Sequence, residues 1–262
     1  LTAIAKSVIT GIAISKAISW LAPKPEIPEF QQDTQAQGVL VNKQSNNANI
    51  PVVYGTRKVG GVRVFLETSG TSNQYLYGAI VLCEGEINNI TSIIVNDSPV
   101  TFSASIANGT TITSNDSKFG TTIQVQPFFG TDDQIASSLL TTLNSWTSNH
   151  KLSGLCYIAF RFTWDNDIYT GIPNIQAIVQ GRKISTFDAS SNETTGQFSS
   201  NPAFCLLDYL TNTRYGKGIP IGDIDIPSFY SASQVAITQV TPFSGGSQIN
   251  LFDCNAVIDT GQ

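Results

Sequence analysis

The chain holds a single histidine, His150, which limits the acid–base chemistry that it could perform. Any mechanism that needs two imidazoles is excluded. A glycosidase needs two carboxylates across a cleft, and Glu67, Glu84 and Glu86 are available, but no pattern in the sequence singles them out. The motifs GxGxxG, GxSxG and HExxH, together with the Walker phosphate loop, do not occur. We therefore predict that the chain is not an enzyme and has no catalytic residue.

The sequence indicates neither a metal site nor a reactive cysteine site. Asp165-Asn166-Asp167 offers two carboxylates but lacks the third oxygen position and the glycine of a calcium loop, so we expect a turn at a strand end. The four cysteines never reach the CxxC spacing of a zinc knuckle or a redox dithiol. They are Cys83, Cys156, Cys205 and Cys254. The first three lie in apolar runs, and we predict buried, reduced thiols and no metal or cofactor.

Composition indicates a folded, sheet-rich protein. The chain has 262 residues, 41% of them hydrophobic and only 13% charged, which excludes a disordered chain. The net charge of −5 argues against a general nucleic-acid-binding protein, since such proteins carry basic clusters. Ile, Val and Thr make up more than a quarter of the chain, and β-branched residues at this density favour strands over helices.

Residues 1–22 have the apolar periodicity of a helix. Ile4, Val8, Ile12 and Ile18 fall on one broad face, and the prolines that follow end the helix. Lys6 and Lys16 interrupt the stretch as a membrane span. Three settings remain open: a helix packed against copies of itself or a partner, a helix packed on its own domain, or membrane contact. We predict the first, with these four side chains as candidate intersubunit or partner contacts.

Residues 23–37 are polar and rich in proline, as in an extended linker. Beyond them, period-two and apolar runs predict strands. They cover Gly38–Val41, Ile50–Tyr54, Val59–Glu67, Tyr75–Cys83, Ile87–Val95, Thr121–Val125, Leu155–Trp164, Ile175–Ile184 and Ile249–Val257.

Three helices are predicted among these strands. One begins at Thr131-Asp132-Asp133 and carries Ile135, Leu139, Leu143 and Trp146. A second begins at Asn201-Pro202, an N-cap followed by proline at the first helical position, and a third covers Pro227–Ala236. Asp188–Ser200 is expected to be a polar loop. Helices do not alternate with strands, so a doubly wound parallel sheet is not expected. The predicted class is mainly β (α+β).

Several sequence blocks resemble one protein family. Residues 50–68 contain Ile-Pro-Val-Val-Tyr-Gly-Thr-Arg, and they lead into Tyr75-Leu-Tyr-Gly-Ala-Ile. Residues 201–218 read Asn-Pro-Ala-Phe-Cys-Leu-Leu-Asp-Tyr-Leu-Thr-Asn-Thr-Arg-Tyr-Gly-Lys-Gly. These blocks resemble the tail-tip attachment, or central tail hub, proteins of lambda-like siphophages. The resemblance covers about 38–98 and 181–262.

The resemblance implies barrel-like β hub domains with two or three short helices and an N-terminal helix. The expected layout is an apolar helix at 1–22, a linker at 23–37, a hub β domain at 38–99 and 181–262, and an inserted hub subdomain at 100–180. The chain lacks methionine and opens on Leu1, so we expect a segment of a longer polypeptide.

In function, the resemblance implies a structural virion protein. A homotrimer would close the distal end of the tail tube, take part in host attachment and open for DNA ejection. Its partners would be tail tube proteins, the tape-measure protein and receptor-binding or fibre proteins, with DNA only in transit. It would assemble in the host cytoplasm and reside at the tail tip.

Arg214 and Tyr215 lie in the most specific block, and two interpretations apply to them. Arg214–Gly218 can end the second helix, because glycine supplies a left-handed cap and the cations suit the negative helix end. The same two residues are also candidate intersubunit contacts. Two other function classes stay open: a tail-associated cell-wall hydrolase and a carbohydrate-binding adhesin domain.

Overall fold

The fold comes from a computed structural model that describes residues 42, 48–243 and 245–259. Strand is the commonest regular structure of this part, which also contains two α-helices and two 3₁₀ turns. The predicted mainly β class with short helices is confirmed. The predicted helix at 1–22, with Ile4, Val8, Ile12 and Ile18, lies outside the described residues, as do the linker and the strand at Gly38–Val41. Neither α-helix of the described part is long and apolar enough to cross a membrane.

The first sheet has the order β3-β4-β9-β8-β7, and every neighbouring pair is antiparallel. The 3₁₀ turn Thr71–Asn73 joins its first two strands. The strands are β3 (Val62–Ser69), β4 (Tyr75–Glu84), β7 (Ile112–Thr113), β8 (Ile123–Phe129) and β9 (Leu155–Thr163).

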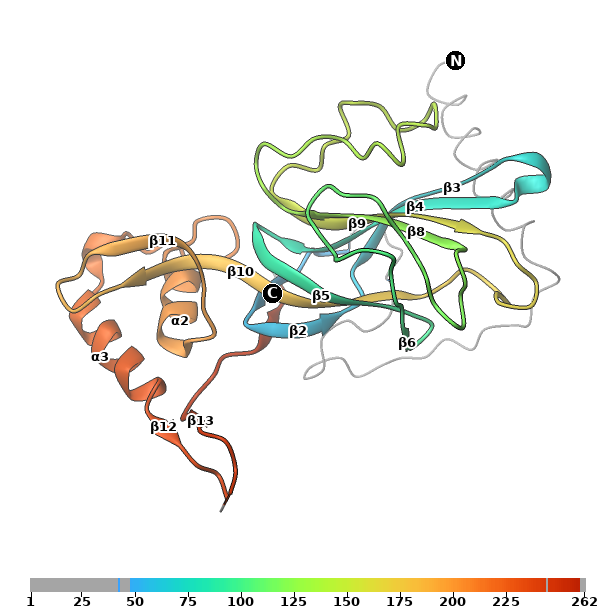
Figure 1. Ribbon diagram of the computed structural model, residues 1–262. Coiled ribbons are helices and arrows are strands. Elements are labelled where there is room, and N and C mark those ends of the chain that lie inside the picture. The colour runs from blue at the N-terminus through green and yellow to red at the C-terminus, as the bar shows by residue number, and fades with distance from the viewer. Residues whose placement is uncertain (1–41, 43–47, 244, 260–262) are drawn as a thin grey trace.

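The second sheet has the order β11-β10-β5-β6, and β2 also pairs with β10. Its strands are β2 (Thr56–Val59), β5 (Ile87–Val95), β6 (Ser98–Pro99), β10 (Ile175–Phe187) and β11 (Glu193–Phe198). β10 is 13 residues long, and Figure 1 shows it running from the sheets to the end of the molecule that carries the helices. β10 therefore belongs to both ends of the molecule.

The two sheets share one apolar core. Ile80 and Ile158 from the first sheet lie in the same buried cluster as Ile90 and Val179 from the second. Each burial of such a side chain contributes about 1.5–3 kcal/mol. The alternation of side chains along each strand places these residues on the inner face, between the two sheets.

The outer face of the first sheet is covered by residues 131–152, where the predicted helix is wrong. The structure has only turns and bends there. Leu139, Leu143 and Trp146 are still buried against β4, β8 and β9, whereas Ile135 is exposed.

Two buried glutamines explain the missing helix. Gln126 Oε1 accepts hydrogen bonds from Ser137 Oγ (2.6 Å) and from the Leu139 amide (3.2 Å). Gln134 Nε2 donates to the carbonyl oxygens of Lys151, Leu152 and Leu155. The segment is rich in Ser, Thr and Asn, whose side chains offer the backbone alternatives to helical hydrogen bonds.

The first and last described strands pair with each other. β1 (Val52–Tyr54) is antiparallel to β14 (Ala256–Ile258), so the end of the chain returns to its beginning. β1 also lies against β10, where a Cβ on Gly181 would overlap the carbonyl oxygen of Val53. Glycine at 181 is what permits this approach of the two backbones.

The helical end is built from α2 (Pro202–Thr211), the 3₁₀ turn Ile221–Asp223, α3 (Ile226–Ala236) and a hairpin of β12 (Gln239–Val240) and β13 (Ile249–Asn250). Asn201 caps α2 as predicted, and its Oδ1 accepts from the Ala203 amide at 3.1 Å. Phe204 and Leu207 pack with Val52, Tyr54 and Ile184. The second and third predicted helices are confirmed, with α3 beginning one residue earlier.

Two sequence-based boundaries are corrected here. The predicted loop at Asp188–Ser200 contains β11, which pairs with β10 across a short hairpin. The predicted strand Ile249–Val257 is two strands, β13 and β14, because residues 251–255 leave the hairpin to reach β1. The predicted boundary between the inserted subdomain (100–180) and the second part of the hub domain (181–262) falls within β10. The division into these domains stays a prediction.

Replacing Leu207 with alanine should destabilise the protein by about 2–5 kcal/mol, because it leaves a cavity in a packed cluster. Its neighbour Leu206 is a matched control on the same helix, 51% exposed. Leu206→Ala should change the free energy of unfolding by no more than about 0.5 kcal/mol. Urea denaturation of the two variants measures the difference, and equal losses would show that α2 is not a core element.

Candidate functional site

The predicted contact residues Arg214 and Tyr215 lie where α2 meets the sheets. α2 ends at Thr211, and Asn212 takes an extended conformation. Asn212 Oδ1 accepts from the amides of Arg214 (2.9 Å) and Tyr215 (3.2 Å), which turns the chain back along the helix. The predicted glycine cap is therefore wrong: an asparagine side chain makes the turn, and the positive φ at Gly218 (66°) comes seven residues after Thr211, where the helix ends.

The centre of this junction is the Asp208 carboxylate. Its Oδ2 accepts a hydrogen bond from Tyr215 Oη at 2.5 Å and another from Tyr54 Oη on β1. Arg182 on β10 places its Nε 3.7 Å from the same oxygen. Hydrogen bonds to a charged group contribute about 1.5–3 kcal/mol each. One carboxylate thus joins a helix, two strands of different sheets and the returning loop.

The two tyrosines remain donors throughout the ordinary pH range. Burial, followed by the nearby Asp208 charge, raises the pKa of Tyr54 far above its usual value. Burial also raises the pKa of Tyr215, with the Arg182 cation acting in the opposite direction. Both hydroxyls are therefore fixed in the protonated form that Asp208 needs.

Arg182 is held on two sides. Its guanidinium carbon lies 5.1 Å from the centroid of the Tyr215 ring, a cation–π contact. On another side it lies against Gly85, where a Cβ would overlap the guanidinium. Gly85 connects β4 to β5 with a φ of 85°, so a side chain there would be strained as well as blocked.

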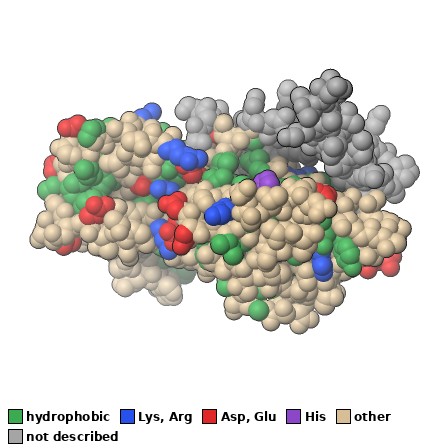
Figure 2. Space-filling view, turned by 90° about the horizontal axis from the view of Figure 1, so that it is seen from above, with side chains coloured by type: hydrophobic (Ala, Val, Ile, Leu, Met, Phe, Trp, Pro, Cys, Tyr) green, Lys and Arg blue, Asp and Glu red, His purple; other side chains and the backbone are tan. Residues whose placement is uncertain are grey.

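A second ion pair lies beside this network. Arg214 Nε is 2.6 Å from Glu84 Oε1, with the Arg214 side chain 72% exposed and that of Glu84 12% exposed. Lys183 Nζ is 2.5 Å from Glu86 Oε1. Figure 2, which views the molecule from above, shows acidic and basic side chains next to one another between the sheets and the helical end.

The carboxylates considered for acid–base chemistry all take part in structural contacts. Glu84 and Glu86 form the ion pairs just described, and Glu67 accepts a hydrogen bond from Ser145. In residues 48–243 and 245–259, no group of three His, Cys, Asp or Glu side chains could hold a metal. Asp165 caps the expected turn after β9, where its Oδ1 accepts from the Asp167 amide at 2.9 Å.

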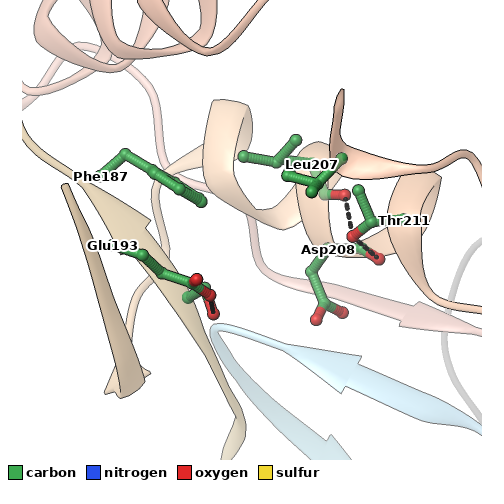
Figure 3. A pocket seen from close by; sticks show the side chains of 7 residues that line it. Phe187, Glu193, Leu207, Asp208 and Thr211 are labelled. Atoms are coloured by element: carbon green, nitrogen blue, oxygen red, sulfur yellow. Dashed lines mark hydrogen bonds between the residues drawn. The ribbon is translucent and has the colours of Figure 1, made fainter. Parts of the chain in front are cut away.

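A small cavity lies beside Asp208, between α2 and the β10–β11 hairpin (Figure 3). Its volume is about 190 Å³, below the ~300–1,000 Å³ of ordinary ligand pockets. Its lining residues are Ser185, Phe187, Glu193, Leu207, Asp208, Thr211 and Ile221. Ser185 Oγ donates to Glu193 Oε1 at 2.5 Å, so that carboxylate already has a partner within the chain.

From the sequence we singled out Arg214 and Tyr215, whose role as intersubunit contacts stays a prediction, and we missed Asp208, Tyr54 and Arg182. One signal was present: Asp208 is the sole charged residue in the helix Pro202–Thr211. A charge within an otherwise apolar helix that packs on a core indicates a buried partner. The partners themselves lie 154 and 26 positions away in the sequence, and local patterns do not reveal them.

Comparison with known proteins confirms the resemblance to phage tail hub proteins. The chain is 27% identical to the baseplate hub protein pb3 of Escherichia phage T5 over 232 aligned residues. The match covers 71% of this chain, and the chain spans about a quarter (24%) of that protein. No family model matches the chain. A solved chain from the virion of a native gene transfer agent particle is 13% identical, with a TM-score of 0.41 over 70% of this chain and 39% of that one.

Replacing Asp208 with asparagine should destabilise the protein by about 1.5–3 kcal/mol, because the charge beside Arg182 and the charge-assisted hydrogen bonds from the two tyrosines are lost. Asp97 is the control, since its side chain is 81% exposed and pairs with Lys58 at 3.8 Å. Asp97→Asn should cost about 0–1 kcal/mol. Urea denaturation compares them, and a cost for Asp208→Asn no larger than the control's would contradict the central role of this carboxylate.

The burial of the four cysteines predicts which thiol reacts first with an alkylating reagent. All four are free thiols, and Cys254 alone is not fully buried. A hydrogen bond from the Cys205 thiol lowers the pKa of Cys254 to about 7, with partial burial acting in the opposite direction. Because the thiolate is the nucleophile, the rate of iodoacetamide alkylation at Cys254 should reach half its maximum at about pH 7.

Peptide mass spectrometry after brief labelling at several pH values measures this rate. In the folded protein Cys83, Cys156 and Cys205 should remain unlabelled, and in urea all four should react. Replacing Cys205 with serine should move the midpoint for Cys254, since the thiol donor is altered. Labelling of Cys83 or Cys156 before Cys254 would contradict the burial described above.

Proposed function

We propose that this chain is part of a structural hub protein of a phage tail, located at the tail tip of the virion. The observation that carries the proposal is the 27% identity to the phage T5 baseplate hub protein, which extends over 71% of the chain. Only a quarter of that relative is matched, so the proposal concerns the hub region that this chain represents.

The contacts at the junction suit a structural role. Its charged side chains pair with one another: Asp208 with Arg182, Glu84 with Arg214 and Glu86 with Lys183. Side chains that perform acid–base catalysis must reach a substrate, whereas these carboxylates are engaged in contacts within the chain. This supports a non-enzymatic hub rather than a cell-wall hydrolase.

The finer proposal is a homotrimer that closes the distal end of the tail tube. Oligomers of identical chains form closed rings when each contact repeats by rotation. In such a ring the chain would contact distal tail or tail tube proteins on one side and receptor-binding or fibre proteins on the other. The tape-measure protein would reach its centre, and DNA would pass through the channel during ejection. Assembly would take place in the host cytoplasm.

The isolated protein should form a trimer, since a closed ring satisfies every copy's contact surface. Native mass spectrometry and light scattering should give three times the mass of one chain. The trimer should persist at higher salt, because an acidic chain with a net charge of −5 does not associate through its own charges. In the virion, antibodies against the chain should label the tail tip.

Two results would contradict the proposal. A monomer at every concentration tested would contradict the homotrimer. Antibody label along the tube or on the capsid would contradict the tail-tip location. Release of soluble fragments from purified cell wall would favour the hydrolase instead, and it should be absent.

A further inference from the structure

Two of the four cysteines lie together at the helical end of the molecule. Cys205 is on α2, and Cys254 is in the segment that runs from β13 to β14. Figure 1 shows that segment returning from the β12–β13 hairpin toward the sheets. Both side chains pack in the apolar cluster that joins α2 to β1, and a hydrogen bond connects the two thiols. The tertiary fold has thus brought two thiols from distant parts of the sequence into contact.

Hydrogen bonds on both sides fix the position of Cys254. Its amide donates to the Ser200 carbonyl oxygen at 2.6 Å. Ser200 Oγ donates to Asp253 Oδ1 at 2.8 Å, and on the other side Asn255 Oδ1 accepts from the Thr56 amide at 2.7 Å. The place of Cys254 beside the start of α2 is therefore set by its neighbours and not by the contact between the thiols alone.

The two thiols differ in the way that a nucleophile and its resolving partner differ. Cys254 is half-buried, whereas Cys205 is only 2% exposed. The hydrogen bond from Cys205 lowers the pKa of Cys254 to about 7, with partial burial acting in the opposite direction. The same hydrogen bond, followed by burial, raises the pKa of Cys205 far above its usual value. Near neutral pH, Cys254 supplies a thiolate while Cys205 keeps its proton beside it.

The other two cysteines are also neighbours, but they are closed to dissolved reagents. Cys83 on β4 is paired with Cys156 on β9, and both are 0% exposed. Burial raises the pKa of Cys156 well above its usual value. Proximity alone is thus common to both pairs, and only the pair at the helical end has a member that a reagent can reach.

We propose that Cys205 and Cys254 form an oxidation site that closes to a disulfide, with a low-molecular-weight disulfide as the co-reactant. The Cys254 thiolate attacks one sulfur of that molecule, which forms a mixed disulfide and releases one small thiolate. The Cys205 sulfur then attacks the Cys254 sulfur, its proton passes to solvent, and the second small thiolate leaves. The two protein thiols together lose two electrons, and the small disulfide gains them.

The disulfide would tie α2 to the segment that leads into β14. The loop that it closes contains α3 and the β12–β13 hairpin. A crosslink of this kind stabilises a fold mainly by restricting the unfolded chain. The pair remains two thiols where reducing thiols are in excess, as in a cytoplasm, and it closes where they are absent. This inference goes beyond the proposed hub function and does not depend on it.

The test incubates the reduced, full chain with oxidised glutathione and follows the products by peptide mass spectrometry without reductant. The wild type should lose two hydrogens and yield a linked Cys205–Cys254 peptide pair, with only a transient glutathione adduct at Cys254. Cys205→Ser should keep that adduct, because no second thiol displaces it. Cys254→Ser should form neither the adduct nor the link.

Urea denaturation measures the effect of the link on the fold. The oxidised wild type should unfold at a urea concentration about 0.5–2 M higher than the reduced wild type, because the unfolded chain is restricted. Cys254→Ser, treated with the same reagent, is the matched control and should show no shift. Circular dichroism before oxidation checks that both variants are folded, and the wild type with Cys254→Ser decides the question if Cys205→Ser is not.

Several results would overturn the proposal. A glutathione adduct that persists at Cys254 of the wild type would show that the two sulfur atoms do not meet. The absence of any reaction at Cys254, a first reaction at Cys205, or a link between Cys83 and Cys156 formed equally fast would each contradict it as well. The mass of the oligomer and the location in the virion test the proposed hub function separately, so either proposal can fail while the other stands.

Discussion

The arrangement of this protein depends on one carboxylate placed between its two halves. Asp208 lies on a helix whose other buried side chains are apolar, and it accepts hydrogen bonds from Tyr54 and Tyr215 while Arg182 lies beside it. Removing one partner of such a cluster leaves an uncompensated charge, which costs more than the cluster itself contributes. The network therefore fixes how α2 sits on the sheets more than it adds to stability.

Two glycines allow backbone and side chains to approach closely around the Asp208 carboxylate. β10 carries Arg182 next to Gly181, and the absence of a side chain at 181 lets β1 reach the position from which Tyr54 bonds Asp208. Gly85 leaves room for the guanidinium on the other side. Gly181 and Gly85 thus make room for the polar network, and the ion pairs of Glu84 and Glu86 lie beside it.

The sequence predicted the elements whose signals are local. Period-two runs marked the long strands, and the Asn201–Pro202 pair marked the start of α2, because both signals arise within a few residues. The prediction of a helix failed at 131–152, where Leu139, Leu143 and Trp146 have helical spacing. There the side chains of Gln126, which precedes the segment, and Gln134, near its start, bond backbone groups and hold the chain in turns. Sequence patterns also missed Asp208, whose partners are brought together only by the tertiary fold. Spacing reports which side chains are buried, and it does not report which backbone groups distant side chains will satisfy.

The pairing of β1 with β14 has a consequence for the order of events during synthesis. Thr56 and Asn255, which hydrogen-bond beside this pairing, are 199 residues apart in the sequence. At roughly 5–20 residues per second, the ribosome needs about 10–40 s between the two. Until then β1 lacks its partner strand β14. Tyr54 gains its carboxylate partner earlier, when Asp208, 154 residues after it, has been made. Contacts of such high sequence separation form late in folding. The pairing of β1 with β14 is thus completed only when translation has passed β14, after both α-helices of the described part have been made.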